Sequence, residues 1–207
     1  MSGDERGSTL DDFLLEEGIL DVPSEQAIKS VLAWQDEHAM KAKTELQGPS
    51  FSIRPARSAA DMAVAAKLFE AYAASLPVDL AYQDFATELA TLPGKYAPPT
   101  GELLLAFSSD GTPLGCVALR PLPPDGCCEM KRLYVDPSAR GLGLGRALVD
   151  AVIEAARQLG YREMRLDSLP SMTEAMALYR KAGFAPIAPY YATPIAGTTF
   201  LGLALDA

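Results

Sequence analysis

The segment Val135-Asp-Pro-Ser-Ala-Arg-Gly-Leu-Gly-Leu-Gly-Arg-Ala-Leu148 is the most informative part of this 207-residue chain. Its apolar start predicts the end of a β-strand, its glycines predict a turn, and the residues after them begin an amphipathic helix. Glycine allows a positive φ and lets a ligand approach the backbone closely. Because the first amides of a helix lack partners within the helix, this segment predicts a pyrophosphate-binding site.

The charges around this predicted helix start support the same ligand. The other predicted helices begin with an acidic residue, as the positive end of a helix dipole favours: Asp11, Glu25, Asp61 and Glu174. This helix instead has Arg140 before it and Arg146 in its first turn. Two cations at that end are unfavourable by about a few tenths of a kcal/mol each unless an anion joins them. A phosphorylated ligand is the simplest such anion.

Three interpretations compete on the glycine spacing alone. A dinucleotide-binding fold requires Gly-x-Gly-x-x-Gly, but after Gly141 and Gly143 the third position is Arg146. A P-loop requires Gly-Lys-Ser/Thr, which this segment lacks. A glycine-rich turn that binds nothing stays open as the third interpretation.

The flanking sequence predicts a mixture of strands and helices. Asp110-Gly111 and Pro123-Pro-Asp-Gly126 separate three apolar runs, which should form an antiparallel meander over 102–107, 113–119 and 127–135. Further strands are expected at 51–55, 161–168, 185–192 and 198–205. Helices are expected at 58–75, 80–91, 146–159 and 171–181, the last opened by a capping box at Ser171-Met-Thr-Glu174. This order predicts an α/β fold with a mixed, partly antiparallel sheet of six to seven strands flanked by helices.

The first 48 residues differ in charge from the rest. They hold 11 acidic and 4 basic residues, a net charge of −7, whereas residues 49–207 have a net charge of −2. We expect an acidic helical extension over 1–48 and one α/β domain over 49–207. Residues 10–35 resemble the lead-in of antitoxin-like helix-turn-helix regulators, but the DNA-reading helices do not follow. A docking arm that forms a homodimer is the hypothesis for this extension.

Composition argues against several other classes. No basic tract indicates nucleic-acid binding, and no apolar run approaches the length of a membrane span or of a signal peptide. One histidine and three cysteines without Cys-x-x-Cys argue against a metal site and a disulfide framework. We therefore expect a cytoplasmic protein whose cysteines are reduced core thiols.

The residues Arg140-Gly-Leu-Gly-Leu-Gly145 resemble the Arg/Gln-x-x-Gly-x-Gly/Ala motif of the GNAT superfamily of N-acetyltransferases. Upstream, Glu129 to Val135 is similar to the fourth strand of that family. Downstream, Ala175 to Phe184 is similar to its late helix with Tyr-x-x-x-Gly-Phe. The resemblance covers residues 50–205 in the order of elements. It departs from the family at Met172, where many members have an asparagine that contacts the donor or nearby backbone.

This resemblance implies acetyl-CoA as the donor. Its pyrophosphate would lie on the backbone amides of Arg140, Gly141, Leu142, Gly143, Leu144, Gly145 and Arg146. Its pantetheine arm would pair with the backbone of Leu133, Tyr134 and Val135, in a gap between two strands. A backbone amide in that strand would polarise the thioester carbonyl, a role typically worth about 3 kcal/mol of transition-state stabilisation.

The resemblance also implies two catalytic side chains. Tyr179 stands at the usual position of the general acid, which would protonate the leaving thiolate, but a core aromatic on a helix face is the other interpretation. Glu129 stands where some members carry a general base, but an ordinary strand carboxylate facing Lys131 or Arg132 is equally consistent. Lys131 and Arg132 are interpreted as solvated strand charges rather than substrate contacts. Tyr190 and Tyr191 either line the acceptor pocket or pack in the core.

The expected function is transfer of an acetyl group from acetyl-CoA to an amine of a small molecule or peptide. Two alternatives use the same fold without catalysis: an acyl-CoA-binding sensor, and a toxin–antitoxin type of interaction protein. No metal is expected in any of them. The residue patterns do not identify the acceptor.

Overall fold

A computed structural model describes residues 51–205 of the chain, and the predicted extension over 1–48, with its two helices, lies outside them. The described part is an α/β fold with a seven-stranded sheet in the order β1-β2-β3-β4-β5-β7-β6. The strands are β1 Phe51–Pro55, β2 Glu102–Ser108, β3 Pro113–Leu122, β4 Cys127–Val135, β5 Glu163–Ser168, β6 Ala185–Pro186 and β7 Thr199–Ala204. The α-helices are α3 Ala59–Ala74, α4 Phe85–Ala90, α5 Leu144–Gln158 and α6 Thr173–Lys181. Short 3-10 helices lie at η1 Leu80–Gln83, η2 Gly94–Tyr96 and η3 Pro137–Ala139.

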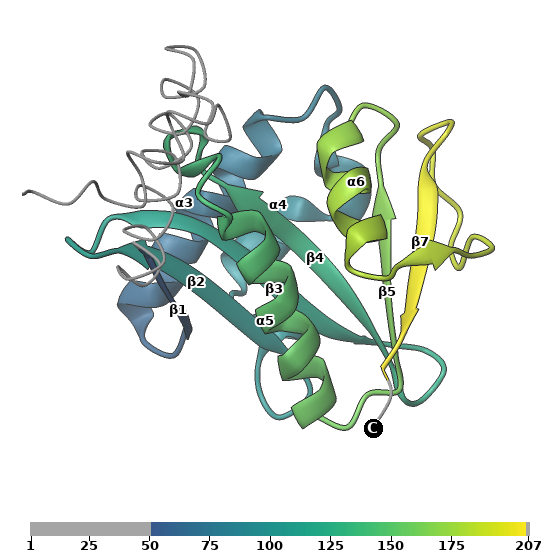
Figure 1. Cartoon of the computed structure of the whole chain (residues 1–207), viewed down its shortest axis with the longest axis horizontal. Helices are drawn as coiled ribbons and strands as arrows, with labels where there is room; N and C mark the ends of the chain where they lie inside the picture. The colour runs from purple at the N-terminus through teal and green to yellow at the C-terminus, as the bar shows by residue number, and fades with distance from the viewer. Residues whose placement is uncertain (1–50, 206–207) are drawn as a thin grey trace, which may run out of the picture. The chain divides into compact units, whose positions relative to one another are not determined.

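Helices cover both faces of the sheet (Figure 1). On one face, α5 packs across β2, β3 and β4, and its apolar stripe of Leu148, Val149 and Val152 is fully buried. On the other face, α3 packs on β3 and β4 through Ala65 and Phe69. Each helix therefore packs an apolar face against the sheet, which gives two cores, one on each side of the sheet.

The predicted meander is confirmed. Strands β2, β3 and β4 pair antiparallel with their sequence neighbours, and β1 pairs antiparallel with β2. The Asp110-Gly111 turn closes the first hairpin, with the Gly111 amide donating to the Ser108 carbonyl at 3.0 Å. Gly111 has a φ of 86°, the conformation for which glycine is preferred in such turns.

A bulge interrupts the pairing between β3 and β4. Cys116 pairs with Tyr134 and Ala118 pairs with Lys131, so β4 has one more residue than β3 between these points. Arg132 lies in that extra stretch with a φ of 56°, a left-handed conformation that non-glycine residues seldom adopt. The bulge therefore turns the backbone of β4 at Arg132 and Leu133.

Strands β4 and β5 separate soon after they begin. They pair in parallel over Cys127–Glu129 and Glu163–Arg165 only, while β5 continues to pair with β7 up to Ser168. The edge of β4 from Met130 to Val135 is therefore not paired with β5. This opening in the sheet, visible between β4 and β5 in Figure 1, positions the site described below.

Three predicted boundaries were wrong. The helix expected over 80–91 is divided into η1 and α4 because Asp84 adopts a φ of 57°. The strand expected over 185–192 is limited to Ala185–Pro186, since prolines at 186 and 189 cannot donate ladder hydrogen bonds. The capping box predicted at Ser171 is absent: α6 begins at Thr173 with Met172 as its N-cap and no side-chain cap, because the Met172 amide donates to the Leu169 carbonyl in a preceding turn.

Two further features bear on the expectations from sequence. Cys116, Cys127 and Cys128 are all buried free thiols, as predicted. Among residues 51–205, none of the helices combines the length and the apolar character needed to cross a lipid bilayer.

Candidate active site

The glycine-rich segment forms a turn between β4 and α5. Gly141 and Gly143 have φ values of 80° and 76°, and Gly143 is the N-cap of α5. As a glycine, Gly143 has no side chain with which to cap this helix start, and the first turn of α5 contains no acidic residue. A Cβ at either glycine would meet nothing within 4 Å, so the turn borders open space. The uncapped amides of α5 therefore face a region that an anion can occupy.

This open region continues as a groove of about 490 Å³ along β4 and the start of α5. Nine of the ten residues predicted to bind the donor line it: Leu133, Tyr134, Val135, Arg140, Gly141, Gly143, Leu144, Gly145 and Arg146. The tenth, Leu142, does not line the groove, and its side chain is exposed. The structure thus brings the strand edge and the glycine turn together along one groove.

The two arginines of the segment differ in their contacts. Arg146 donates from Nε to both oxygens of Asp150 at 2.8 and 2.9 Å and from Nη1 to the Lys181 carbonyl at 3.1 Å. Arg140 forms no ion pair with any residue of the described part. Both side chains line the groove. An anion there would find Arg140 available, whereas Arg146 already shares its charge with an exposed carboxylate.

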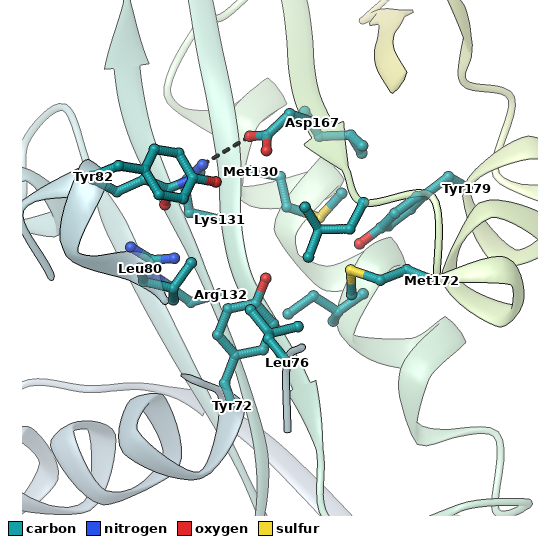
Figure 2. A pocket seen from close by; sticks show the side chains of 14 residues that line it. Tyr72, Leu76, Leu80, Tyr82, Met130, Lys131, Arg132, Asp167, Met172 and Tyr179 are labelled. Carbon is teal, nitrogen blue, oxygen red and sulfur yellow. Dashed lines mark hydrogen bonds and ion pairs between the residues drawn. The ribbon is translucent and has the colours of Figure 1, made fainter. Parts of the chain in front are cut away.

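A small cavity of about 30 Å³ lies beside the groove, in the opening between β4 and β5. The two spaces share Tyr72, Leu133 and Met172 as common walls. Figure 2 shows the hydroxyl groups of Tyr72 and Tyr179 directed into this cavity from different sides. The groove and the cavity therefore meet at the bulge of β4.

The surroundings of Tyr179 are compatible with both interpretations that the sequence left open. Its ring is buried and packs edge-on against Phe184 at 5.9 Å between ring centres, while its hydroxyl faces the cavity. Burial raises the pKa of Tyr179, and the nearby Tyr72 and Asp167 raise it further. The phenol therefore stays protonated at neutral pH, as a proton donor must.

Glu129 is completely enclosed. Its side chain is 1% exposed, accepts hydrogen bonds from Arg120 Nε at 2.7 Å and Tyr190 Oη at 2.8 Å, and lines neither the groove nor the cavity. Lys131 Nζ lies 3.8 Å from Oε1, the oxygen that accepts from Tyr190. Within residues 51–205, Glu129 is therefore connected to the cavity through Lys131.

Lys131 and Arg132 are not solvated strand charges, so that interpretation was wrong. Lys131 is 8% exposed and Arg132 is 4% exposed. Lys131 Nζ donates to Asp167 at 2.8 Å, across the opening between the strands (Figure 2). Arg132 donates two hydrogen bonds to Glu88, at 2.7 and 2.8 Å. Each cation is buried because a carboxylate from another element compensates it.

The pairing with Arg132 also determines the ionisation of Glu88. Burial alone would raise the pKa of Glu88, but the hydrogen bonds and charge of Arg132 outweigh it, so the pKa is lowered. Tyr96 Oη donates a further hydrogen bond to this carboxylate at 2.9 Å. The short helix α4 is therefore tied to the bulge of β4 by a buried ion pair.

The two late tyrosines have different surroundings. Tyr190 packs against Phe200 at 5.1 Å and donates its hydroxyl hydrogen to Glu129. The hydroxyl of Tyr191 is buried without a hydrogen-bond partner in residues 51–205. Neither lines the cavity, so core packing describes them better.

Sequence reasoning missed Tyr72, Gln83 and Asp167, which all line the cavity. Tyr72 belongs to the apolar face of α3, and nothing in its spacing distinguishes it from Leu68 or Phe69. Burial raises the pKa of Tyr72 to about 12, with Arg132 opposing and Asp167 adding to the shift. Asp167 lies near the end of a strand, and only the separation of β4 from β5 places it opposite Lys131.

Comparison with known proteins places the chain among acetyltransferases. Residues 66–184 match the family model described as the acetyltransferase (GNAT) family. An uncharacterized N-acetyltransferase of Schizosaccharomyces pombe is 43% identical over 139 residues, which cover 67% of this chain and 85% of that protein.

Two solved structures are similar in fold. A Klebsiella pneumoniae protein described as an acyl-CoA N-acyltransferase is 28% identical in sequence. Its structure superposes with a TM-score of 0.59 and covers 77% of this chain and 100% of that one. A Salmonella typhimurium protein described as an acetyltransferase was solved with its cofactor acetyl-CoA. It is 22% identical in sequence, with a TM-score of 0.55 over 76% of this chain and 95% of that one. At that identity the second similarity concerns the fold alone.

Proposed function

The chain belongs to the GNAT family of acetyltransferases, and we propose that its groove binds acetyl-CoA while its cavity receives the amine that is acetylated. The observation that carries this proposal is the meeting of groove and cavity at Tyr72, Leu133 and Met172. A donor in the groove and an amine in the cavity would touch only there. Direct transfer between them needs no covalent enzyme intermediate.

The donor would be held mainly by backbone. The uncapped amides of α5 and the side chain of Arg140 suit the pyrophosphate, because both offer positive charge to one end of the groove. The edge of β4 from Met130 to Val135 has no pairing with β5, so it offers peptide groups to the amides of the pantetheine arm. The bulge at Arg132 and Leu133 suits a backbone amide that polarises the thioester carbonyl.

The transfer then proceeds in one addition and one elimination. The amine nitrogen attacks the thioester carbon, the C–N bond forms, and the carbonyl oxygen gains negative charge that the strand amide stabilises. The C–S bond breaks as the carbonyl re-forms, and the thiolate takes the hydroxyl proton of Tyr179. The proton that the attacking amine loses returns to Tyr179, directly or by way of solvent, so that protons balance over the cycle.

The role of Glu129 as a base stays a prediction. An alkylamine with a pKa of about 10 must lose a proton before it attacks. Glu129 would act through Lys131, whose Nζ lies 3.8 Å from the carboxylate, or through a water beside it. This indirect contact favours a role in fixing Lys131 over direct contact with the amine.

Two further proposals concern the setting of the enzyme. Free, buried cysteines at 116, 127 and 128 support work in the cytoplasm, where thiols stay reduced. The acidic residues 1–48 are proposed as the segment through which two copies associate.

Calorimetric titration with acetyl-CoA tests the proposed function. We expect micromolar binding by the protein and at least a tenfold loss of affinity in Arg140→Ala/Arg146→Ala. The matched control is Arg157→Ala, which removes an equally exposed arginine from the other end of α5. Equal affinity in all three proteins would contradict the proposed phosphate site. Binding without release of CoA in the presence of any amine would leave the non-catalytic sensor as the better description.

A further inference from the structure

The hydrogen-bonding groups of the small cavity are unevenly satisfied. Its two cations are committed, Lys131 to Asp167 and Arg132 to Glu88, both with distances below 3 Å. Two acceptors are not committed. The Gln83 side-chain oxygen is buried without a hydrogen-bond partner in the described chain, and only one carboxylate oxygen of Asp167 is bonded there. A buried Gln83 oxygen without a donor, beside a carboxylate with a second oxygen to offer, indicates a guest that brings N–H groups.

The surroundings of Asp167 strengthen this point. Burial and the nearby Asp167 carboxylate raise the pKa of Tyr191, whose hydroxyl is close to Asp167 but makes no hydrogen bond of standard length and angle within residues 51–205. The only cation that contacts Asp167 within residues 51–205 is Lys131. Glu129, 3.8 Å from the same Lys131 Nζ, is paired with Arg120, so Lys131 and Asp167 form one pair that uses only one carboxylate oxygen of Asp167. An ammonium beside the second oxygen would gain a charge-assisted hydrogen bond.

Size and walls restrict the guest further. A cavity of about 30 Å³ accepts a group little larger than a water molecule, which matches an aminomethyl end and not a branched carbon. Apolar side chains form much of the remaining wall, among them Leu76, Leu80 and Leu166. Because both cations that line the cavity in the described part of the chain are already paired, a carboxylate next to the amine would be desolvated without a partner.

We propose that this cavity selects an unbranched primary alkylammonium group with no carboxylate beside it, recognised by Asp167 and Gln83. The proposal rests on the proposed acetyl transfer and adds the class of acceptor to it. Asp167 and Gln83 are specificity-determining residues, because their oxygens would contact the amine before it loses its proton.

Three small amines test this selection by acetyl transfer from acetyl-CoA. Butylamine is the unbranched primary amine, sec-butylamine is its isomer with a methyl branch at the nitrogen-bearing carbon, and norvaline is butylamine with a carboxylate at that carbon. We expect kcat/KM for butylamine to exceed both others by about tenfold or more. Equal or better use of norvaline would overturn the inference.

Two variants separate recognition from structure. Asp167→Asn should raise KM for butylamine about tenfold and leave the Kd for acetyl-CoA unchanged, because a charge-assisted hydrogen bond is lost. The same change frees Lys131, so it should shift the preference between butylamine and norvaline toward norvaline. A merely structural role for Asp167 would lower both rates without changing that ratio.

Gln83→Leu gives a second measure should Asp167→Asn fail to fold. It removes the unpaired oxygen from η1 and should raise KM for butylamine several-fold.

The control for Asp167→Asn is Asp125→Asn, which removes one acidic charge at an exposed turn between β3 and β4. If acetyl-CoA binds and butylamine at millimolar concentration is not acetylated, the inference fails while the donor site stands. If acetyl-CoA does not bind, the proposed function itself fails.

Discussion

At the residue scale, two tyrosine hydroxyls face one cavity, so the proposed proton transfer can be tested by substitutions that remove a single oxygen atom. Tyr72 and Tyr179 come from helices on opposite faces of the sheet, and both direct their hydroxyls into the cavity, while only Tyr72 also lines the groove. Only Tyr179 was predicted as the proton donor. Removing one oxygen at a time therefore distinguishes which phenol serves the leaving thiolate.

Tyr179→Phe is expected to lower kcat by about a hundredfold, since a positioned general acid contributes at least that much. The Kd for acetyl-CoA should not change, because the ring and its contact with Phe184 remain. Steady-state kinetics and calorimetry check both values. Tyr161→Phe, which loses only a hydrogen bond to the Thr100 carbonyl, is the control. An unchanged kcat in Tyr179→Phe removes this residue from the mechanism.

Glu88→Gln is expected to cost about 3–5 kcal/mol of unfolding free energy at pH 7, because it leaves the buried Arg132 without its carboxylate. Urea denaturation measures this loss. Glu154→Gln removes an exposed partner of Arg157 and should cost no more than about 1 kcal/mol. Similar losses in the two variants would show that the buried pair contributes no more than a surface pair.

The same pair predicts the direction of a pH dependence. The pKa of Glu88 is lower in the folded protein than in the unfolded chain, so its contribution is fully present above the unfolded value of about 4.3. As pH falls below that value, the contribution is lost. The stability difference between the protein and Glu88→Gln should thus be constant from pH 8 to pH 6 and decrease below about pH 4.

At the element scale, the turn before α5 depends on backbone conformation. Gly143 has a φ of 76° with open space where a side chain would lie, and Gly160 closes the same helix with a φ of 80° and equally open space. Alanine at either position should cost about 1 kcal/mol of stability, because a Cβ disfavours that conformation.

Only Gly143→Ala should also weaken acetyl-CoA binding, by about tenfold, since its methyl group would project toward the groove. Gly160→Ala serves as the matched control with the same backbone cost. Urea denaturation and calorimetry on both variants check this prediction. Equal acetyl-CoA affinity in the two would place the donor elsewhere.

Elements were predictable from sequence wherever local chemistry determines them. The meander followed from Asp-Gly turns between apolar runs, and the glycine-rich segment from Arg140 to Arg146 predicted the turn that borders the groove. The acceptor side was not predictable, because Lys131 meets Asp167 only where β4 and β5 separate. The start of α6 was misplaced for a related reason: a turn from Leu169 to Met172, and not the Ser171 side chain, determines where that helix begins.

At the scale of the whole molecule, the acidic residues 1–48 have no assigned part in catalysis. Deleting residues 1–46 is expected to change the mass of the particle in solution or its melting temperature, if two copies associate through this segment. Light scattering and a thermal melt measure the two quantities. The charge of the deleted segment suggests a comparison at low and high salt, since screening weakens contacts between exposed charges. An unchanged mass and melting temperature would refute the hypothesis.

The opening between β4 and β5 also has a consequence for motion. The sheet consists of two blocks, β1 to β4 and β5 to β7, joined in hydrogen bonding by only three residue pairs. A pantetheine arm lying along Met130 to Val135 would serve as a temporary extra strand between the blocks. Each catalytic cycle would then remove and replace a piece of the sheet. Amide hydrogens of this edge should exchange with solvent rapidly in the free protein and slowly with donor bound. The donor would then reduce the local opening of the sheet between β4 and β5.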